Sequence, residues 1–140
     1  MTVAQKRPEF RNINAFTDLP KYRLPAAGIV SILHRISGVL MFVLMPLIMW
    51  MFDTSVSSEI SFARFRHAFA GGASGVLLKL IALALIWAYL HHFTAGVRHL
   101  WMDVSHKAVS KSFGGSSAKF TLAFSLVLTV ILGAKLFGVY

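Results

Sequence analysis

The fold of this chain is decided by residues 80–103, which read LIALALIWAYLHHFTAGVRHLWMD. The first half of this stretch is apolar throughout. Together with the adjacent residues it is long enough to form a membrane-spanning helix. The second half carries His91, His92, Arg98 and His99. Polar groups at membrane depth are costly and usually functional, and an imidazole is a common metal ligand. The stretch therefore predicts a membrane helix that carries a site.

The composition of the whole chain agrees with a membrane protein. Of 140 residues, 56% are hydrophobic and the mean hydropathy is +0.68, above what soluble domains show. The apolar windows predict an all-α protein with three transmembrane helices at about 26–52, 76–103 and 117–138. Residues 1–25 are polar and contain three prolines, which predicts a cytoplasmic arm ahead of one membrane-anchor domain over 26–140.

Charge and cysteine content narrow the function. Without cysteine, the chain cannot supply thiolate ligands, so any iron–sulfur centre must belong to a partner. The net charge of +9 does not indicate nucleic acid, because eight Lys and Arg residues lie in the N-terminal segment and the loop between the second and third spans, and only three lie in the loop between the first two spans and at the C-terminal end. The positive-inside rule then predicts a cytoplasmic N-terminus and a periplasmic C-terminus in a bacterial inner membrane.

Local signals predict details of the spans. Pro46 falls inside the first span, where a proline can kink or loosen the helix. Because proline is common in membrane helices, we favour simple tolerance. In the loop over 53–75, residues 61–70 are mixed apolar and basic and predict a short interfacial helix. The glycine-rich residues 71–75 predict a break before the second span. Small residues recur every four positions in the third span and predict close packing against another helix: Ser125, Thr129 and Gly133.

Polar residues gather at one predicted depth. The first span runs outward and the second runs back, so their cytoplasmic ends lie at the same level. Both ends are polar, the first with Ser31, His34 and Arg35 and the second with His92, Arg98, His99 and Asp103. His92 is about 9 Å deeper than Arg98, which makes it the best candidate for a buried metal ligand.

Helix geometry limits how these histidines could bind a haem iron. His92 and His99 share a face but lie about 10 Å apart along the axis, and His91 and His92 point about 100° apart. Neither pair can supply both axial ligands of one iron, so a second ligand must come from another helix, most simply on another chain. His99 lies nearer the polar boundary, suited to a propionate or a water. His34 and Arg35 can offer positive charge to propionates.

Each of these residues also has a simpler interpretation. His92 could form only a hydrogen bond between helices, and Arg35 and Arg98 could extend to lipid phosphates. Ser31 could bond to the backbone of its own helix. Alternatively, Ser31 and Arg35 are four residues apart on one face, where a hydroxyl and a guanidinium could hold one carbonyl-bearing molecule.

Two blocks, SILHRISG at 31–38 and His92 to His99 within HHFTAGVRHLWMD, resemble the cytochrome b membrane-anchor subunits of succinate dehydrogenase, respiratory complex II. Arg7-Pro8 and the three-span layout fit as well. The resemblance implies that His92 is one axial ligand of a haem b shared with a second small anchor subunit. It also implies that Ser31 and Arg35 bind ubiquinone and that His34 lies near the haem propionates.

The same resemblance implies the partners and the role. The anchors would dock a flavoprotein and an iron–sulfur subunit, and electrons from succinate would pass to quinone in the tricarboxylic acid cycle and respiratory chain. The chain by itself would have no catalytic residue. Two alternatives remain: a haemless membrane anchor, and a small transporter or channel. The second would need polar groups through the outer half of the spans, whereas the ionisable cluster stays on one side.

Overall fold

The computed structural model describes residues 13–14, 16–18 and 21–140, which form helices joined by short connections. The helices are α1 (Ala26–Val43), α2 (Met45–Val56), α3 (Glu59–Phe69), α4 (Gly72–Val104), the 3-10 helix η2 (His106–Val109) and α5 (Lys111–Leu136). Three of them, α1, α4 and α5, are long and apolar enough to cross a membrane. The prediction of an all-α, three-span protein is therefore confirmed. Arg7, Pro8 and much of the predicted N-terminal arm lie outside the described residues.

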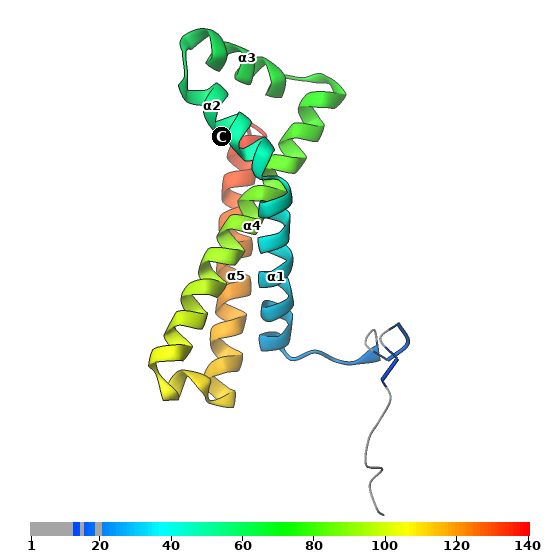
Figure 1. The fold of residues 1–140 in the computed structure, drawn as a ribbon, viewed down its shortest axis with the longest axis vertical. Coiled ribbons are helices and arrows are strands. Elements are labelled where there is room, and N and C mark those ends of the chain that lie inside the picture. The colour runs from blue at the N-terminus through cyan, green and yellow to red at the C-terminus, as the bar shows by residue number, and fades with distance from the viewer. Residues whose placement is uncertain (1–12, 15, 19–20) are drawn as a thin grey trace, which may run out of the picture.

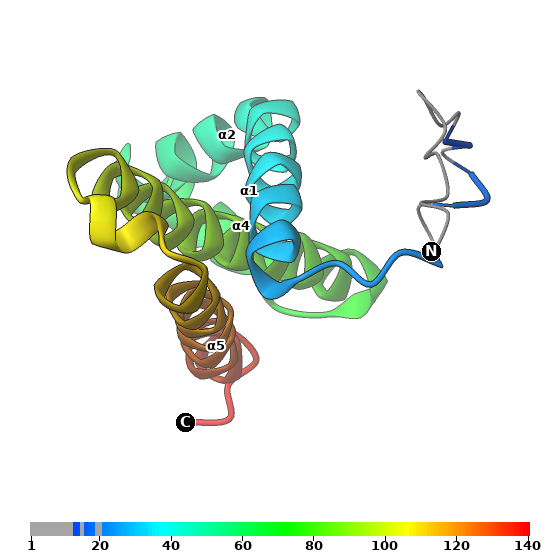
Figure 2. The same ribbon diagram turned by 90° about the horizontal axis from the view of Figure 1, so that it is seen from below.

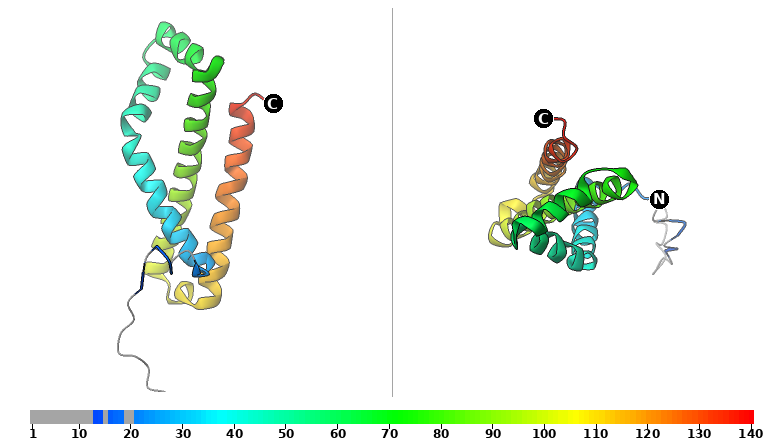
Figure 3. Two further views of the ribbon diagram at one scale, coloured as in Figure 1. Left: turned by 90° about the vertical axis from the view of Figure 1, so that its right-hand side faces the viewer. Right: turned by 90° about the horizontal axis from the view of Figure 1, so that it is seen from above.

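Helix α4 is the centre of the arrangement, with α1 and α5 packed against it (Figures 1 and 2). The start of α1, the end of α4, η2 and the start of α5 meet at one end of the molecule, the η2 end. The other end, which we call the α3 end, holds α2, α3 and the start of α4 (Figure 3). With 33 residues, α4 is about 50 Å long, so it extends beyond the apolar core of a bilayer, which is about 30 Å thick.

Burial is inverted relative to a soluble protein. Several of the most buried side chains are polar: Ser37, His91, Arg98, Thr121, Ser125 and Thr129. Large apolar side chains point outward instead, such as Phe42 at 77% exposure and Phe120 at 66%. An apolar exterior suits lipid tails or a partner helix, and hydroxyls and small residues between helices allow close approach and interhelical hydrogen bonds.

The small-residue stripe of α5 packs as the sequence predicts. Ser125, Thr129 and Gly133 are all buried, together with Gly114, Ala118 and Thr121. A Cβ atom at Gly133 would lie 2.7 Å from Leu83 Cδ1, so this glycine lets α4 and α5 approach each other closely.

Within the first predicted span, 26–52, the helix is interrupted near Pro46, which we expected it to tolerate. Helix α1 ends at Val43, and Leu44, with φ −89° and ψ 9°, separates it from α2. Pro46 is the second residue of α2. Proline lacks an N–H and its ring clashes with the carbonyl four residues earlier, so the helix cannot continue through it undisturbed. As a result α2 departs from the line of α1 (Figures 1 and 3).

The short helix predicted within residues 53–75 is present as α3, which begins after Ser58 with a reciprocal hydrogen-bonded cap to Ser61, and its place at a membrane interface stays a prediction. The expected break over 71–75 is shorter than predicted, because α4 already begins at Gly72. Gly72 has a φ of +70°, and a Cβ at Gly75 would lie 3.4 Å from backbone atoms of Phe69. The glycines thus form a tight corner between α3 and α4 rather than a loop. Helix α5 also starts before residue 117, at Lys111.

Candidate functional site

His92 of α4 faces α1 and is fixed there by its Nδ1 atom. This atom lies 3.0 Å from the backbone carbonyl oxygen of His34 and 3.3 Å from Ser37 Oγ. A carbonyl oxygen can only accept, so Nδ1 of His92 donates the proton. The Ser37 hydroxyl donates to the same carbonyl at 2.9 Å, which leaves its oxygen free to accept. The tautomer of His92 is therefore set, with the lone pair on Nε2.

The Nε2 atom of His92 has no hydrogen-bond partner among the described residues and is not enclosed by them, whereas the Nε2 atoms of His34 and His91 are buried without a partner. Within the part of the chain that the structure describes, His92 therefore combines a fixed ring with an accessible lone pair. An imidazole whose other nitrogen donates to a backbone carbonyl is the usual form of a metal-ligating histidine.

Gly38 makes room for the ring of His92. A Cβ atom at this position would lie 3.0 Å from Cε1 and 3.3 Å from Nδ1 of His92. Both atoms belong to a ring whose Nδ1 atom is held by the His34 carbonyl and the Ser37 hydroxyl. A methyl group added at Gly38 would therefore displace the ring from this position. The absence of a side chain at Gly38 is therefore part of how α1 holds His92.

Three imidazoles form a row between α1 and α4, which we call the histidine row: His92, His34 and His99. The rings of His34 and His92 stack with centroids 4.1 Å apart and an interplanar angle of 25°. His99 lies on the other side of His34, with centroids 5.2 Å apart and a tilt of 42°. The described residues contain no group of three or more His, Asp or Glu side chains arranged to hold a metal ion, since stacked rings do not converge on a common point.

His91, the neighbour of His92, points to a different face of α4. It is fully buried, its Nδ1 lies 3.2 Å from Ser125 Oγ on α5, and its ring stacks on Trp87. The divergence follows from the 100° step between consecutive residues of a helix.

Arg98 lies on the same face as His91 and serves the packing of α5. Its Nε donates to Ser117 Oγ at 3.0 Å and its Nη2 to the carbonyl oxygen of Gly114 at 3.1 Å. The side chain is 9% exposed. Of the interpretations open at the sequence level, extension to lipid phosphates does not describe Arg98, which connects the end of α4 to the start of α5.

Ser31 and Arg35 lie beside the histidine row without joining it. Ser31 is half-buried, and its hydroxyl forms no hydrogen bond to any described residue, its own helix backbone included. Arg35 is exposed and lines a shallow groove of about 440 Å³ whose other walls are apolar: Ile36, Val39, Leu40 and Val43. A guanidinium on an apolar surface leaves strong donors free for a ligand.

The structure thus brings together His34, His92 and His99 from the predicted set, and no hydrogen bond or ring contact among the described residues joins Ser31 or Arg35 to them. Sequence reasoning gave no role to Ser37, Gly38 or Ser125 at the site. A signal for the first two was present, because a serine three residues after His34 and a glycine four residues after it place small groups on the same face. Which atoms of the His92 ring Ser37 and Gly38 would contact depends on how α1 and α4 are rotated against each other, and the sequence does not give this rotation.

The sequence of this chain is similar to those of known membrane subunits. Residues 9–132 match the model of the family described as succinate dehydrogenase/fumarate reductase transmembrane subunit. A succinate dehydrogenase cytochrome b556 subunit from Coxiella burnetii is 33% identical over 116 residues, covering 83% of this chain and 90% of the relative. The protein of the same name from Paracoccus denitrificans is 31% identical over 113 residues, 81% of this chain and 83% of its own.

Proposed function

Because the chain belongs to the succinate dehydrogenase/fumarate reductase transmembrane subunit family, we propose that it binds haem b through His92 and forms part of a quinone-reduction site. The chain is a multi-pass bacterial membrane protein and a membrane subunit of succinate dehydrogenase, non-catalytic by itself. We also propose that the chain assembles with a second small membrane-anchor subunit, a flavoprotein and an iron–sulfur subunit.

The observation that carries the haem proposal is the state of His92. Its Nδ1 proton is held by the His34 carbonyl, and its Nε2 lone pair is accessible. This donor set fits a b-type haem, whose iron takes neutral imidazole nitrogens as axial ligands. His91 fits less well, because its free Nε2 is enclosed within the helix bundle. When bound, the haem would supply a one-electron redox centre, and the relatives' name, cytochrome b556, is in keeping with one.

The second axial ligand comes, in this proposal, from a second small membrane-anchor subunit. In the described residues His91 and His99 are the other histidines of α4, and neither would be able to hold the same iron together with His92. His91 faces α5, and His99 is separated from His92 by the ring of His34. We propose that this second anchor subunit packs against the exposed apolar side chains of the membrane helices. The flavoprotein and iron–sulfur subunits would bind at the η2 end, which we assign to the cytoplasm by the positive-inside rule.

The remaining residues of the histidine row are proposed to hold the haem propionates. His34 and His99 lie on the η2 side of His92, and Arg35 follows His34 on α1. Imidazole N–H groups and a guanidinium are suitable donors to carboxylates, and charge-assisted hydrogen bonds of this kind are the stronger ones.

Ser31 and Arg35 are proposed to bind ubiquinone. Both donors are free of other partners among the described residues, and Arg35 opens on an apolar groove. The hydroxyl and the guanidinium would orient a quinone carbonyl oxygen and stabilise the negative charge that develops on it during reduction. The surrounding aliphatic side chains of α1 would exclude water from the ring.

Purification of the complex in mild detergent tests the proposal, with a visible spectrum and an identification of every co-purifying chain. The expected result is a b-type spectrum together with a second small membrane subunit, a flavoprotein and an iron–sulfur protein. Isolation of the same four chains without haem absorbance would favour the haemless anchor. Ion or solute flux through proteoliposomes that contain this chain alone would favour a transporter.

A further inference from the structure

A cationic pocket lies at the α3 end, far from the histidine row. Its volume is about 620 Å³, and three basic side chains from three different helices line it: Arg66 of α3, Lys79 of α4 and Lys135 of α5. The other lining residues are apolar, and no Asp or Glu lines the pocket. Three like charges that line one pocket without a carboxylate repel one another, so an anionic ligand would be favoured here.

The concentration of these cations is unusual for this end of the molecule. The positive-inside rule disfavours Lys and Arg at the periplasmic ends of spans. Only four such residues occur on α3 and the adjoining ends of α4 and α5, and three of them line this one pocket. The fourth, Arg64, is exposed on α3 and is not among the lining residues. The three cations are therefore gathered rather than spread over the surface.

Lys79 shows how the protein holds one of these charges in place. It is half-buried, and its Nζ lies 5.7 Å from the centroid of the Phe137 ring. A cation over an aromatic ring is attracted by the electron density of its face. The ammonium therefore stays beside the C-terminal end of α5, where Lys135 also lies.

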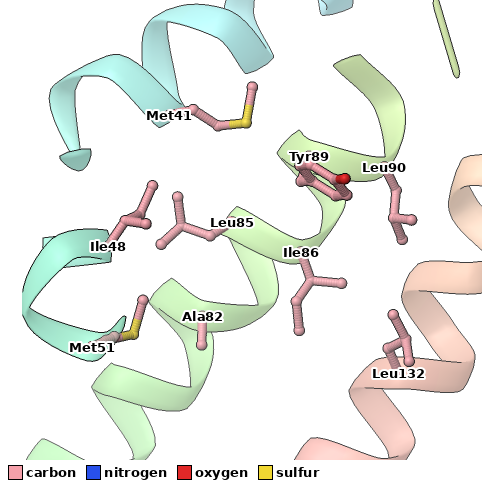
Figure 4. A pocket seen from close by; sticks show the side chains of 9 residues that line it. All are labelled: Met41, Ile48, Met51, Ala82, Leu85, Ile86, Tyr89, Leu90 and Leu132. Carbon is pink, nitrogen blue, oxygen red and sulfur yellow. The ribbon is translucent and has the colours of Figure 1, made fainter. Parts of the chain in front are cut away.

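An apolar groove adjoins the cationic pocket. It has a volume of about 420 Å³, and Met51 and Ala82 line both spaces. Figure 4 shows Met41 and Ile48 on one side of the groove and Leu85 and Ile86 of α4 on the other. Apart from Tyr89, every side chain that lines the groove is aliphatic or a methionine. A charged head and an apolar tail would thus each find a matching surface across one shared boundary.

The break at Leu44 provides the space for the groove. Because α2 departs from the line of α1, it packs on α3 and not closely on α4. A continuous helix through residue 56 would stay parallel to α1. Pro46 therefore has a consequence beyond the local kink, since it separates α2 from α4 where the apolar groove lies.

From these observations we propose that the cationic pocket and the groove together bind an anionic phospholipid. Arg66, Lys79 and Lys135 hold its phosphodiester, and an acyl chain lies in the groove along Met51 and Ala82. Arginine and lysine are the side chains that bind phosphate oxygens in proteins, and basic pockets between transmembrane helices bind lipid headgroups. Free phosphate would satisfy the cations and leave the groove without a ligand. The proposal is independent of haem and quinone binding.

Native mass spectrometry of the purified complex tests it, after exchange into nanodiscs of phosphatidylcholine with or without phosphatidylglycerol. The wild-type complex is expected to retain phosphatidylglycerol and not phosphatidylcholine. Each of Arg66→Gln, Lys79→Gln and Lys135→Gln should weaken retention about fivefold, since a basic residue near a membrane surface contributes about 1 kcal/mol. Arg64→Gln, which removes an exposed charge from the same helix as Arg66, should leave it unchanged.

Two further measurements make the result decisive. The subunit composition and visible spectrum of each variant complex report whether it is assembled, and an assembled triple variant that retains phosphatidylglycerol as the wild type does would overturn the proposal. A loss of phosphatidylglycerol retention in Arg64→Gln equal to that in the three pocket variants would also overturn the proposal. In a separate arm, inorganic phosphate is added to complexes in pure phosphatidylcholine. A thermal stabilisation by phosphate that equals the one given by phosphatidylglycerol would show a phosphate site instead of a lipid site.

Discussion

Gly38 of α1 lies against the ring of His92 of α4, so closely that a Cβ atom at Gly38 would approach Cε1 to 3.0 Å. The ring is also held by the carbonyl oxygen of His34 through Nδ1. The glycine and the carbonyl together define where the Nε2 lone pair points. A site assigned to His92 must therefore be sensitive to a single methyl group on the facing helix.

Gly38→Ala is expected to weaken haem binding about tenfold or more, because changes to the residues that orient a metal-ligating histidine cost roughly 10- to 100-fold in affinity. Haem content per complex, from the reduced-minus-oxidised spectrum after detergent washing, measures it. Gly115→Ala is the matched control, since a Cβ atom there meets nothing within 4 Å, and a helical alanine is favoured over glycine. Equal haem retention in the two variants would contradict the prediction.

Arg98→Leu is expected to loosen the contact between α4 and α5 while leaving haem bound. It removes two hydrogen bonds to α5 and leaves the buried Gly114 carbonyl without this partner, a loss of about 1–3 kcal/mol. A lower midpoint of thermal unfolding with an unchanged spectrum at low temperature is the expected result. Lys111→Gln, an exposed cation at the start of α5, should change neither. Loss of haem at an unchanged midpoint would place Arg98 at the cofactor instead.

Arg35→Leu is expected to lower succinate–quinone turnover roughly 100-fold, the range found when a donor to a developing negative charge is removed. Electron transfer from succinate to a soluble dye should persist, because the dye does not need the quinone site. The ratio of the two activities in the same preparation is the measurement. A parallel loss of both activities would indicate misassembly and count against a role for Arg35 in quinone binding.

Ser125→Ala is expected to destabilise the pair of helices α4 and α5 by about 1–3 kcal/mol, since it leaves a second buried nitrogen of His91 without a partner. The haem spectrum should not change, because His91 faces away from His92. Differential scanning calorimetry of the complex measures the first effect. A shifted haem spectrum in Ser125→Ala would show that His91 and the cofactor are coupled.

Much of this architecture follows from the sequence because lipid leaves few choices. Uncharged windows of about 20 residues predict the spans, and small residues at every fourth position of α5 predict its buried face. The heptad spacing of His92 and His99 likewise predicts a shared face, as the histidine row has it. Depth alone groups Arg98 with these histidines. A helical wheel places it about 120° from His92, and it indeed faces α5.

Other features depend on tertiary packing and were not predictable. A proline inside a membrane helix is sometimes tolerated without a break and sometimes kinks the helix. At Pro46 the structure has the kink. The acceptor for His92 Nδ1 is a backbone carbonyl, which carries no sequence signal. The cationic pocket joins residues from three helices that are distant in the chain, so no local pattern marks it.

His92, and not its neighbour His91, is proposed to hold the haem iron, and a matched pair of variants distinguishes the two histidines. Complexes with His92→Ala and with His91→Ala are purified, checked for all their subunits, and compared by reduced-minus-oxidised visible spectra. We expect His92→Ala to abolish the b-type spectrum and His91→Ala to retain it. A b-type spectrum that survives in His92→Ala and disappears in His91→Ala would contradict it.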